Sequence, residues 1–500
     1  MPSKMQITVT IKNEDGTEII QSSVERELPN IKEIETEGFR PSINKIDESF
    51  LEARKEATEA AVTSYLEEIA KKKTEEQAIH HRDGSIRRTI RDYGLELEIG
   101  SIDVPMRAIS DKYGKTLYSP GDELFEKKAP MERILSANFK ELVLDFSTDM
   151  SYRSAENRLN RIRWQETGIS YRTICNIVER EGKAMEAALE SKSRSIFETA
   201  GFTPDGLPPE GHNMEKPAFK PMDPEEVEEA AEILGLDQEL NLSDYECPDS
   251  TANISMDDVL TKKQAGERPD SPEKGARKYN SNTVIHVHKG EASRILVAGT
   301  AAAAMRQLVA LVLFARLAGS NAFVFFTDGA SDLHGAIKRL FEFQTYKIIL
   351  DWHHLLKKLE QRLSSASKGR KIRNALLDGL RPLLWKGNVD AAIKYLSEIP
   401  EDDLKAPEYI TKLIDYLLRN KEYIPCYALR KELGLRNSSN RGEKANDLVV
   451  ARRQKHDGMS WSPHGSTALA TVTATSLNGQ LNLWTHDRDL HFDLRSPKAA

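Results

Sequence analysis

The chain has 500 residues, of which 30% are charged and 39% hydrophobic, and its formal net charge is −7. This length exceeds what one hydrophobic core organises, so we expect two to four domains. The best candidate for a membrane span, residues 308–317, is short and contains Arg316, and the first residues predict a strand rather than a signal peptide. Three widely separated cysteines argue against disulfides and a cysteine-based zinc site, so we expect a cytoplasmic protein without membrane contact.

Acidic and basic residues are separated along the chain. Residues 223–238 carry a dense acidic run, whereas residues 352–373 hold seven Lys and Arg against one Glu. Residues 430–455 hold eight Lys and Arg against three acids. This distribution predicts a basic surface in the C-terminal half that suits nucleic acid, with a merely solvated face as the alternative.

Residues 1–129 are expected to form an α+β region. A hairpin is predicted over residues 5–20, a charged helix over 54–73, and two strands over 95–99 and 102–106.

Residues 130–200 are predicted to be helical. Two short helices are expected at 151–160 and 167–178, with Gly168 in the turn and Ser170 capping the second helix. This pattern is typical of a helix-turn-helix DNA-binding region, and an ordinary helical hairpin is the alternative.

Residues 201–250 are the clearest boundary in the chain. Six prolines lie between residues 201 and 224, and the acidic run follows them. We expect an exposed linker or a loosely packed insertion here.

The pattern then becomes α/β over residues 251–354 and 434–485. The expected elements, in order, are strands at 253–259, 283–288 and 294–298, a helix at 301–317, a strand at 323–327, a helix at 333–341 and a strand at 346–350. Three hairpin-like strands followed by helix, strand, helix and strand is the order of an RNase H-like mixed sheet. Leucine spacing predicts that residues 355–433 form an all-helical insertion.

Acidic residues accompany three of the predicted strands. Asp257 and Asp258 lie within the first strand, where acids are uncommon, and Asp328 and Asp351 each follow a buried strand. Turn formation at Asp328-Gly329 and helix capping by Asp351 are the alternatives to a metal site. Glu443 begins a basic helix, in a context that suits phosphate.

Two histidines follow Asp351. With His353 and His354 it could form a metal cluster or a phosphate contact. A zinc hydrolase is not expected, because no further ligand stands at a recognisable spacing.

Taken together, these segments resemble the DDE transposases of bacterial and archaeal insertion sequences, of the Mutator-like type with a helical insertion before the last acid. The resemblance rests on the segments 254–264, 326–330, 349–355 and 436–461, and covers roughly residues 250–485. The helix-turn-helix stretch also looks like the end-binding region of that family.

The resemblance implies a role for each matched residue. Asp257, Asp328 and Glu443 would be the catalytic metal-binding triad, with Asp258 the alternative first acid. Asp351 and His354 match the family's acid-x-x-His motif, beside His353. The basic residues expected to hold DNA are Lys262, Lys263, Arg436, Arg441, Lys444, Arg452, Arg453 and Lys455.

The implied activity is metal-dependent cleavage at the element ends and strand transfer into target DNA. Two Mg²⁺ or Mn²⁺ ions are the expected cofactors, and double-stranded DNA is the expected partner of a homo-oligomer associated with the nucleoid. An RNase H-type nuclease or junction resolvase without strand transfer remains an alternative. So does a catalytically inactive DNA-binding protein derived from a transposase.

Overall fold

The computed structural model divides the chain into two compact units. It describes residues 3–29, 31–37, 39–78, 87–125, 133–165, 168–209, 211, 216–236, 241–267, 278–319, 321–456 and 458–495. Unit 1 comprises residues 1–177 and 485–487, and unit 2 comprises residues 178–484 and 488–500. The boundary falls within helix α6 (Tyr171–Ala200). Each unit combines a β-sheet with helices, so the chain is an α/β protein.

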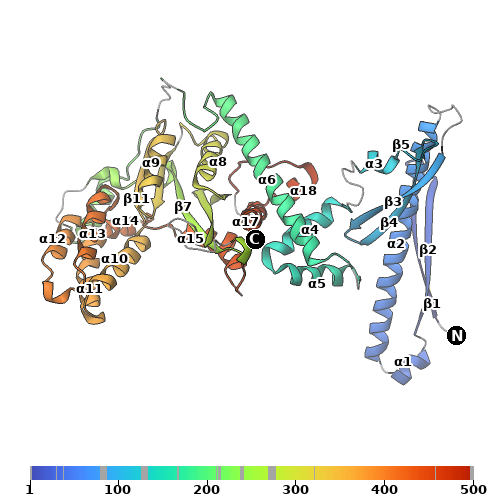
Figure 1. The fold of residues 1–500 in the computed structure, drawn as a ribbon. Helices are drawn as coiled ribbons and strands as arrows, with labels where there is room; N and C mark the ends of the chain where they lie inside the picture. Colours follow the sequence, from blue (N-terminus) through green and yellow to red (C-terminus); the bar gives the residue numbers. More distant parts are fainter. Residues whose placement is uncertain are drawn as a thin grey trace. The chain divides into compact units, whose positions relative to one another are not determined.

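Unit 1 contains the long helix α2 (Phe39–Ala78) and two sheets. Strands β1 (Ser3–Lys12) and β2 (Glu18–Leu28) form an antiparallel hairpin that packs on α2 (Figure 1). The second sheet has the order β5-β4-β3-β6, and its strand β4 also packs on α2. The remaining elements are α1 (Ile31–Glu37), β3 (Arg87–Leu97), β4 (Gly100–Ser110), β5 (Thr116–Tyr118), α3 (Pro120–Leu124) and β6 (Ile134–Leu135).

Helix α4 (Ala137–Asp149) precedes the two helices that were expected to flank a turn. Helix α5 (Tyr152–Ile162) is followed by α6, and the Ser170 hydroxyl accepts a hydrogen bond from the Thr173 N–H at 3.2 Å. A Cβ on Gly168 would lie 2.2 Å from Asn160 Oδ1, so a larger residue would displace the Asn160 side chain, which accepts a hydrogen bond of 3.0 Å from the Ile169 N–H. The cap is therefore confirmed, but the second helix has 30 residues and is not short.

Unit 2 is organised by a five-stranded sheet of order β11-β10-β7-β8-β9. Its strands are β7 (Thr251–Lys262), β8 (Tyr279–Lys289), β9 (Ala292–Ala298), β10 (Ala322–Thr327) and β11 (Tyr346–Leu350). β7, β8 and β9 are antiparallel, whereas β10 runs parallel to both β7 and β11. The predicted order of strands and helices is confirmed, and β7 is long enough to place Asp257 and Asp258 in mid-strand.

Helices cover both faces of this sheet. Helices α8 (Ala301–Phe314) and α9 (Ser331–Leu340) share one face with Met256. Helix α15 (Asn440–Asn446), the π-helical segment η6 (Asp447–Ala451) and α17 (Pro463–Leu477) pack on the other face, where Val259 and Val284 meet Ala445. Two further helices of this region are α16 (Arg452–Gln454) and α18 (Leu481–Asp487).

The predicted helical insertion is confirmed over residues 352–432. Its helices are α10 (Trp352–Ala366), α11 (Arg370–Trp385), α12 (Val389–Ser397), α13 (Glu408–Arg419) and α14 (Tyr427–Glu432). Buried leucines such as Leu359, Leu380 and Leu413 form one core that continues onto Phe326 and Ile349 of the sheet. The insertion therefore stands beside β11, as Figure 1 shows.

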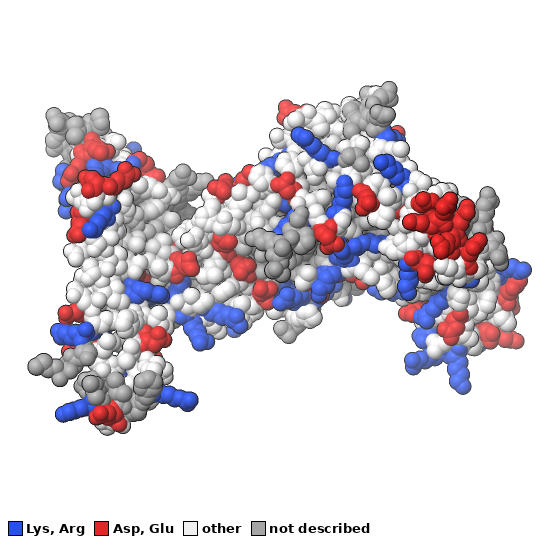
Figure 2. Space-filling view, turned by 180° about the vertical axis from the view of Figure 1, so that it is seen from behind, with Lys and Arg blue, Asp and Glu red and all other residues white. Residues whose placement is uncertain are grey.

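The segment 201–250 differs from the expected linker. Residues Pro224–Ile233 form helix α7, and its buried Val227 packs against Leu429 of α14. Further along, the buried Glu246 carboxylate accepts two hydrogen bonds of 2.6 Å from Arg430. The acidic run is thus the exposed side of a packed helix. Figure 2, turned by 180° from Figure 1, shows a dense acidic patch at the right, the side to which this turn brings α7 (light green, at the left of Figure 1). Residues 210, 212–215 and 237–240 lie outside the described residues.

Candidate metal centre

Three acids stand at the same level across adjacent parallel strands. Phe326 of β10 pairs with Ser255 of β7, and Thr327 pairs with Leu350 of β11. Continuing this register brings Asp328 level with both Asp257 and Asp351. The carboxyl ends of β10 and β11 therefore gather acids beside the middle of β7, where ligands concentrate in open α/β sheets.

The alternation of side chains along β7 separates Asp257 from Asp258. Asp257 pairs with Val284 and accepts a hydrogen bond of 3.0 Å from Asn446 Nδ2, so it lies on the face covered by α15. Asp258 is exposed on the opposite face and accepts a hydrogen bond from the Thr283 hydroxyl. Asp257 therefore shares a face with the helix of Glu443.

Asp257 is surrounded by charged and titratable groups. Burial raises the pKa of the Asp257 carboxyl above its ordinary value. His354 opposes this rise, while the negative charges of Asp328 and Asp258 add to it. The charge of a half-buried acid beside another acid is stabilised by a cation, so the electrostatics fit a metal site.

Asp328 is held by its own turn and by the helical insertion. Its Oδ1 accepts a hydrogen bond of 2.9 Å from the Ala330 N–H, and its carbonyl accepts one of 3.2 Å from the Tyr416 hydroxyl of α13. Gly329 has a φ of +82°, and a Cβ there would lie 2.9 Å from Leu350 Cδ1 and 3.0 Å from the Tyr416 hydroxyl. The glycine thus serves both the turn and the close packing that orients the Asp328 carboxylate.

Asp351 is almost fully buried and its carboxylate is committed to three donors. Its Oδ1 accepts from the His354 N–H at 2.9 Å, which caps α10. Its Oδ2 accepts from the backbone N–H and, at 2.8 Å, from the hydroxyl of Ser439. The capping role considered from the sequence is confirmed, and Asp351 also fixes the turn that begins α15.

Glu443 lies near Asp351 and His354. One ligand atom from each of these three residues lies within 4.8 Å of the others. Among the described residues, no such group of three is formed by the expected triad of Asp257, Asp328 and Glu443. His354 belongs to the observed group and also interacts electrostatically with Asp257 of the expected triad. His353 is exposed and does not belong to the observed group. Sequence reasoning missed that Glu443 supplies a third donor beside His354.

The donor set fits a divalent cation. Asp351, His354 and Glu443 bring one ligand atom each within 4.8 Å of one another, and Asp257 interacts electrostatically with His354 and Asp328. Hard cations prefer carboxylate oxygens and tolerate partial hydration, and Mn²⁺ also accepts imidazole. Asp351 is less available, because both of its oxygens already accept hydrogen bonds.

The basic residues expected to hold DNA differ in exposure. Lys262, Lys444, Arg452 and Lys455 are exposed, and Lys263, Arg436 and Arg441 are half-buried. Arg453 is only 4% exposed, and its guanidinium lies over the Trp461 ring at 5.2 Å. Its role in the structure is packing, so it differs from the expected surface contact.

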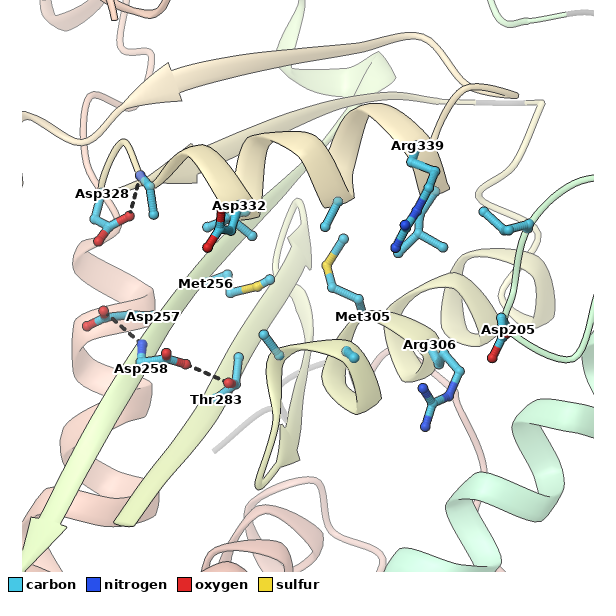
Figure 3. A pocket seen from close by; sticks show the side chains of 17 residues that line it. Asp205, Met256, Asp257, Asp258, Thr283, Met305, Arg306, Asp328, Asp332 and Arg339 are labelled. Carbon is cyan, nitrogen blue, oxygen red and sulfur yellow. Dashed lines mark hydrogen bonds between the residues drawn. The ribbon is translucent and has the colours of Figure 1, made fainter. Parts of the chain in front are cut away.

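A cavity of about 560 Å³ opens beside the acids, between the sheet, α8 and α9. Figure 3 shows Asp257, Asp258 and Asp328 at one end and Arg306 and Arg339 at the other. Met256, Met305 and Leu333 contribute apolar lining between these ends. This cavity could not be predicted from the sequence, since Arg306 and Arg339 lie on two separate helices, α8 and α9, whose packing brings them to it.

Comparisons of the chain with models of known protein families, with curated proteins and with solved structures found no match. Within the described parts of the chain, no helix combines the length and apolar character needed to cross a membrane.

Proposed function

We propose that the chain is a DNA transposase with an RNase H-like core, in which Asp257, Asp328 and Glu443 hold divalent metal. The observation that carries this proposal is the alignment of acids across β7, β10 and β11 beside the helix of Glu443. The strand order, three antiparallel strands followed by two parallel ones, supports the RNase H-like assignment. The large helical insertion between β11 and α15 supports a Mutator-like transposase.

The proposed reaction has two steps at one site. Water attacks a phosphodiester at the element end, and the freed 3′-OH then attacks target DNA. Bound Mg²⁺ or Mn²⁺, as a pair of ions, would supply an activated nucleophile and stabilise charge on the attacking and leaving oxygens.

The chain's own residues would orient this chemistry. Tyr416 holds the backbone of Asp328, and burial raises the pKa of the Tyr416 hydroxyl, which keeps it a neutral donor. Asp351 holds the turn that precedes Glu443. The exposed lysines and arginines near α15 would contact phosphates rather than bases.

Recognition of the element ends is proposed for residues 130–200. Helices α5 and α6 are joined by the capped turn described above, and Tyr171, Arg172 and Thr173 are exposed at the start of α6. Such an exposed helix start suits insertion into a major groove. Two ends must be brought together, so a homo-oligomer on DNA is part of the proposal.

A supercoiled plasmid carrying the gene with its flanking DNA tests the proposed function. Incubation of the purified protein with Mg²⁺ or Mn²⁺ should release 3′-OH ends at the element boundaries and then yield joined products. Cleavage without joining would favour a nuclease or resolvase. No cleavage with either ion, by a protein that binds the plasmid, would refute the enzymatic proposal.

A further inference from the structure

A second polar group lies on the Asp257 face of the sheet. Strand β8 carries two histidines on this face, since His286 pairs with Ser255 and His288 pairs with Asn253. Helix α15 covers this part of the sheet so closely that a Cβ on Gly442 would lie 2.5 Å from Ser255 Cβ. We call Arg436, Arg441, His286 and His288 the arginine–histidine cluster.

The cluster carries positive charge without a matching acid. Arg441 adjoins Gly442, which packs on Ser255 opposite His286, and the positive charges of both arginines lower the pKa values of both histidines. In the described structure, no carboxylate lies within ion-pair distance of Arg436 or Arg441. The exposed Glu291 attracts Arg436 only from farther away, and burial lowers the pKa of Arg436 to about 10. Two half-buried cations that repel one another cost stability, and an anion bound between them would reduce this cost.

The histidines are buried and lack partners. His288 is 2% exposed and His286 is 7% exposed. Both ring nitrogens of His288 and Nδ1 of His286 have no hydrogen-bond partner. Buried polar atoms nearly always form hydrogen bonds in native proteins. These three ring nitrogens could therefore form hydrogen bonds with a bound ligand.

We propose that the arginine–histidine cluster binds a phosphate group. Guanidinium donors match phosphate oxygens in pairs, and a tetrahedral anion offers enough acceptors for several donors at once. A carboxylate has only two oxygens and would leave part of the cluster unpaired.

The phosphate belongs to the DNA strand held at the carboxylates, an assignment that rests on the proposed function. His286 is opposite Ser255, two residues before Asp257 on the same strand face. Two strand residues span about 7 Å, so the cluster adjoins the carboxylates along the sheet. It would anchor a neighbouring phosphate and fix the register of the strand at the metal centre.

Thermal unfolding with inorganic phosphate tests the anion site without requiring catalysis. The wild-type protein should gain ~3 °C in Tm with phosphate relative to chloride at matched ionic strength. A protein carrying Arg436→Gln and Arg441→Gln should lose this gain. It should also melt higher than wild type in chloride, because the repulsion is removed, which a purely structural role would not produce. The matched control Lys431→Gln, exposed on α14, should keep the phosphate response.

A DNA-binding arm distinguishes a strand phosphate from free phosphate. The dependence of duplex affinity on salt should weaken by about one unit of slope per arginine replaced. If the protein cleaves DNA but shows no phosphate-specific gain in Tm, the phosphate site is refuted and the proposed function stands. A phosphate gain with an unchanged salt slope would overturn the assignment to DNA.

Discussion

The buried carboxylate of Asp351 accepts hydrogen bonds from both the backbone N–H and the hydroxyl of Ser439, 88 residues later in the chain. Asp351 follows β11 and caps α10, where the helical insertion begins, and Ser439 precedes α15, where the insertion has ended. This contact closes the insertion and sets the position of α15, which carries Glu443.

Asp351→Asn is expected to destabilise the protein by about 1–3 kcal/mol, because an amide nitrogen would face donors that now meet a carboxylate oxygen. Ser439→Ala removes only the hydroxyl and should cost about 1 kcal/mol. Denaturant unfolding measures both changes. The exposed Asp415→Asn on α13 is the control, expected to change stability by no more than about 0.5 kcal/mol. Equal stability of the Asp351 and Asp415 variants would contradict the conclusion that the contact between Asp351 and Ser439 holds the two ends of the insertion together.

Gly329→Ala should lower stability by about 1–3 kcal/mol and weaken Mn²⁺ binding, because a Cβ at positive φ would press on Leu350 and Tyr416 beside Asp328. Unfolding and calorimetric titration with Mn²⁺ measure the two effects. Gly335→Ala provides a matched control on α9, where a Cβ meets nothing within 4 Å. That control should stabilise the helix by about 0.5–1 kcal/mol. The account of this turn fails if both alanines behave alike.

The positions of β10 and β11 could be predicted from the sequence, because each is a short run of mainly apolar residues that is followed by an acid. Residues 323–327, followed by Asp328, are such a run, and the structure places their strand, β10, between β11 and the central strand β7. The sequence alone favours Asp257 over Asp258 as the first metal-binding acid only weakly. The structure distinguishes them, because side chains alternate along β7 and only Asp257 lies on the face covered by α15.

What the sequence could not provide depends on contacts between distant residues. Nothing local to Ser439 indicates that it bonds to Asp351, and nothing local to Arg453 indicates that it lies buried over Trp461. The acidic run likewise has the composition of a linker, but Val227 and its neighbours find an apolar surface on α14. Tertiary packing overrides composition in each of these cases.

Lowering the pH is expected to reduce stability through His286 and His288. Burial, helped by the positive charges of the nearby arginines, lowers their pKa values from the ordinary 6.5 to about 4 for His286 and about 3 for His288. Below about pH 6.5 the unfolded chain binds protons at these positions that the folded chain does not, so the free energy of unfolding falls toward pH 4. Replacing both histidines with glutamine should flatten this part of the profile. The exposed His353→Gln should leave it unchanged, and a profile that the double substitution does not alter would refute this account.

Packing of α7 is tested by Val227→Ala. Val227 is fully buried against α14, so its truncation should cost about 1–3 kcal/mol of unfolding free energy. The neighbouring Glu228 is exposed, and Glu228→Ala should change stability by no more than about 0.5 kcal/mol. If neither substitution altered the unfolding curve, the segment would behave as the linker expected from its composition.

The most direct measurement compares Asp328→Asn with the wild type in plasmid cleavage and joining with Mg²⁺ or Mn²⁺. Asparagine keeps the acceptor for the Ala330 N–H and removes one negative charge beside Asp257, so Tm and DNA binding should be retained. Both cleavage and joining should collapse, since one metal site serves both steps. Asp257→Asn and Glu443→Gln should behave in the same way, and Asp258→Asn on the opposite face should be milder. An Asp328→Asn protein that cleaves and joins DNA at nearly the wild-type rate would contradict the account.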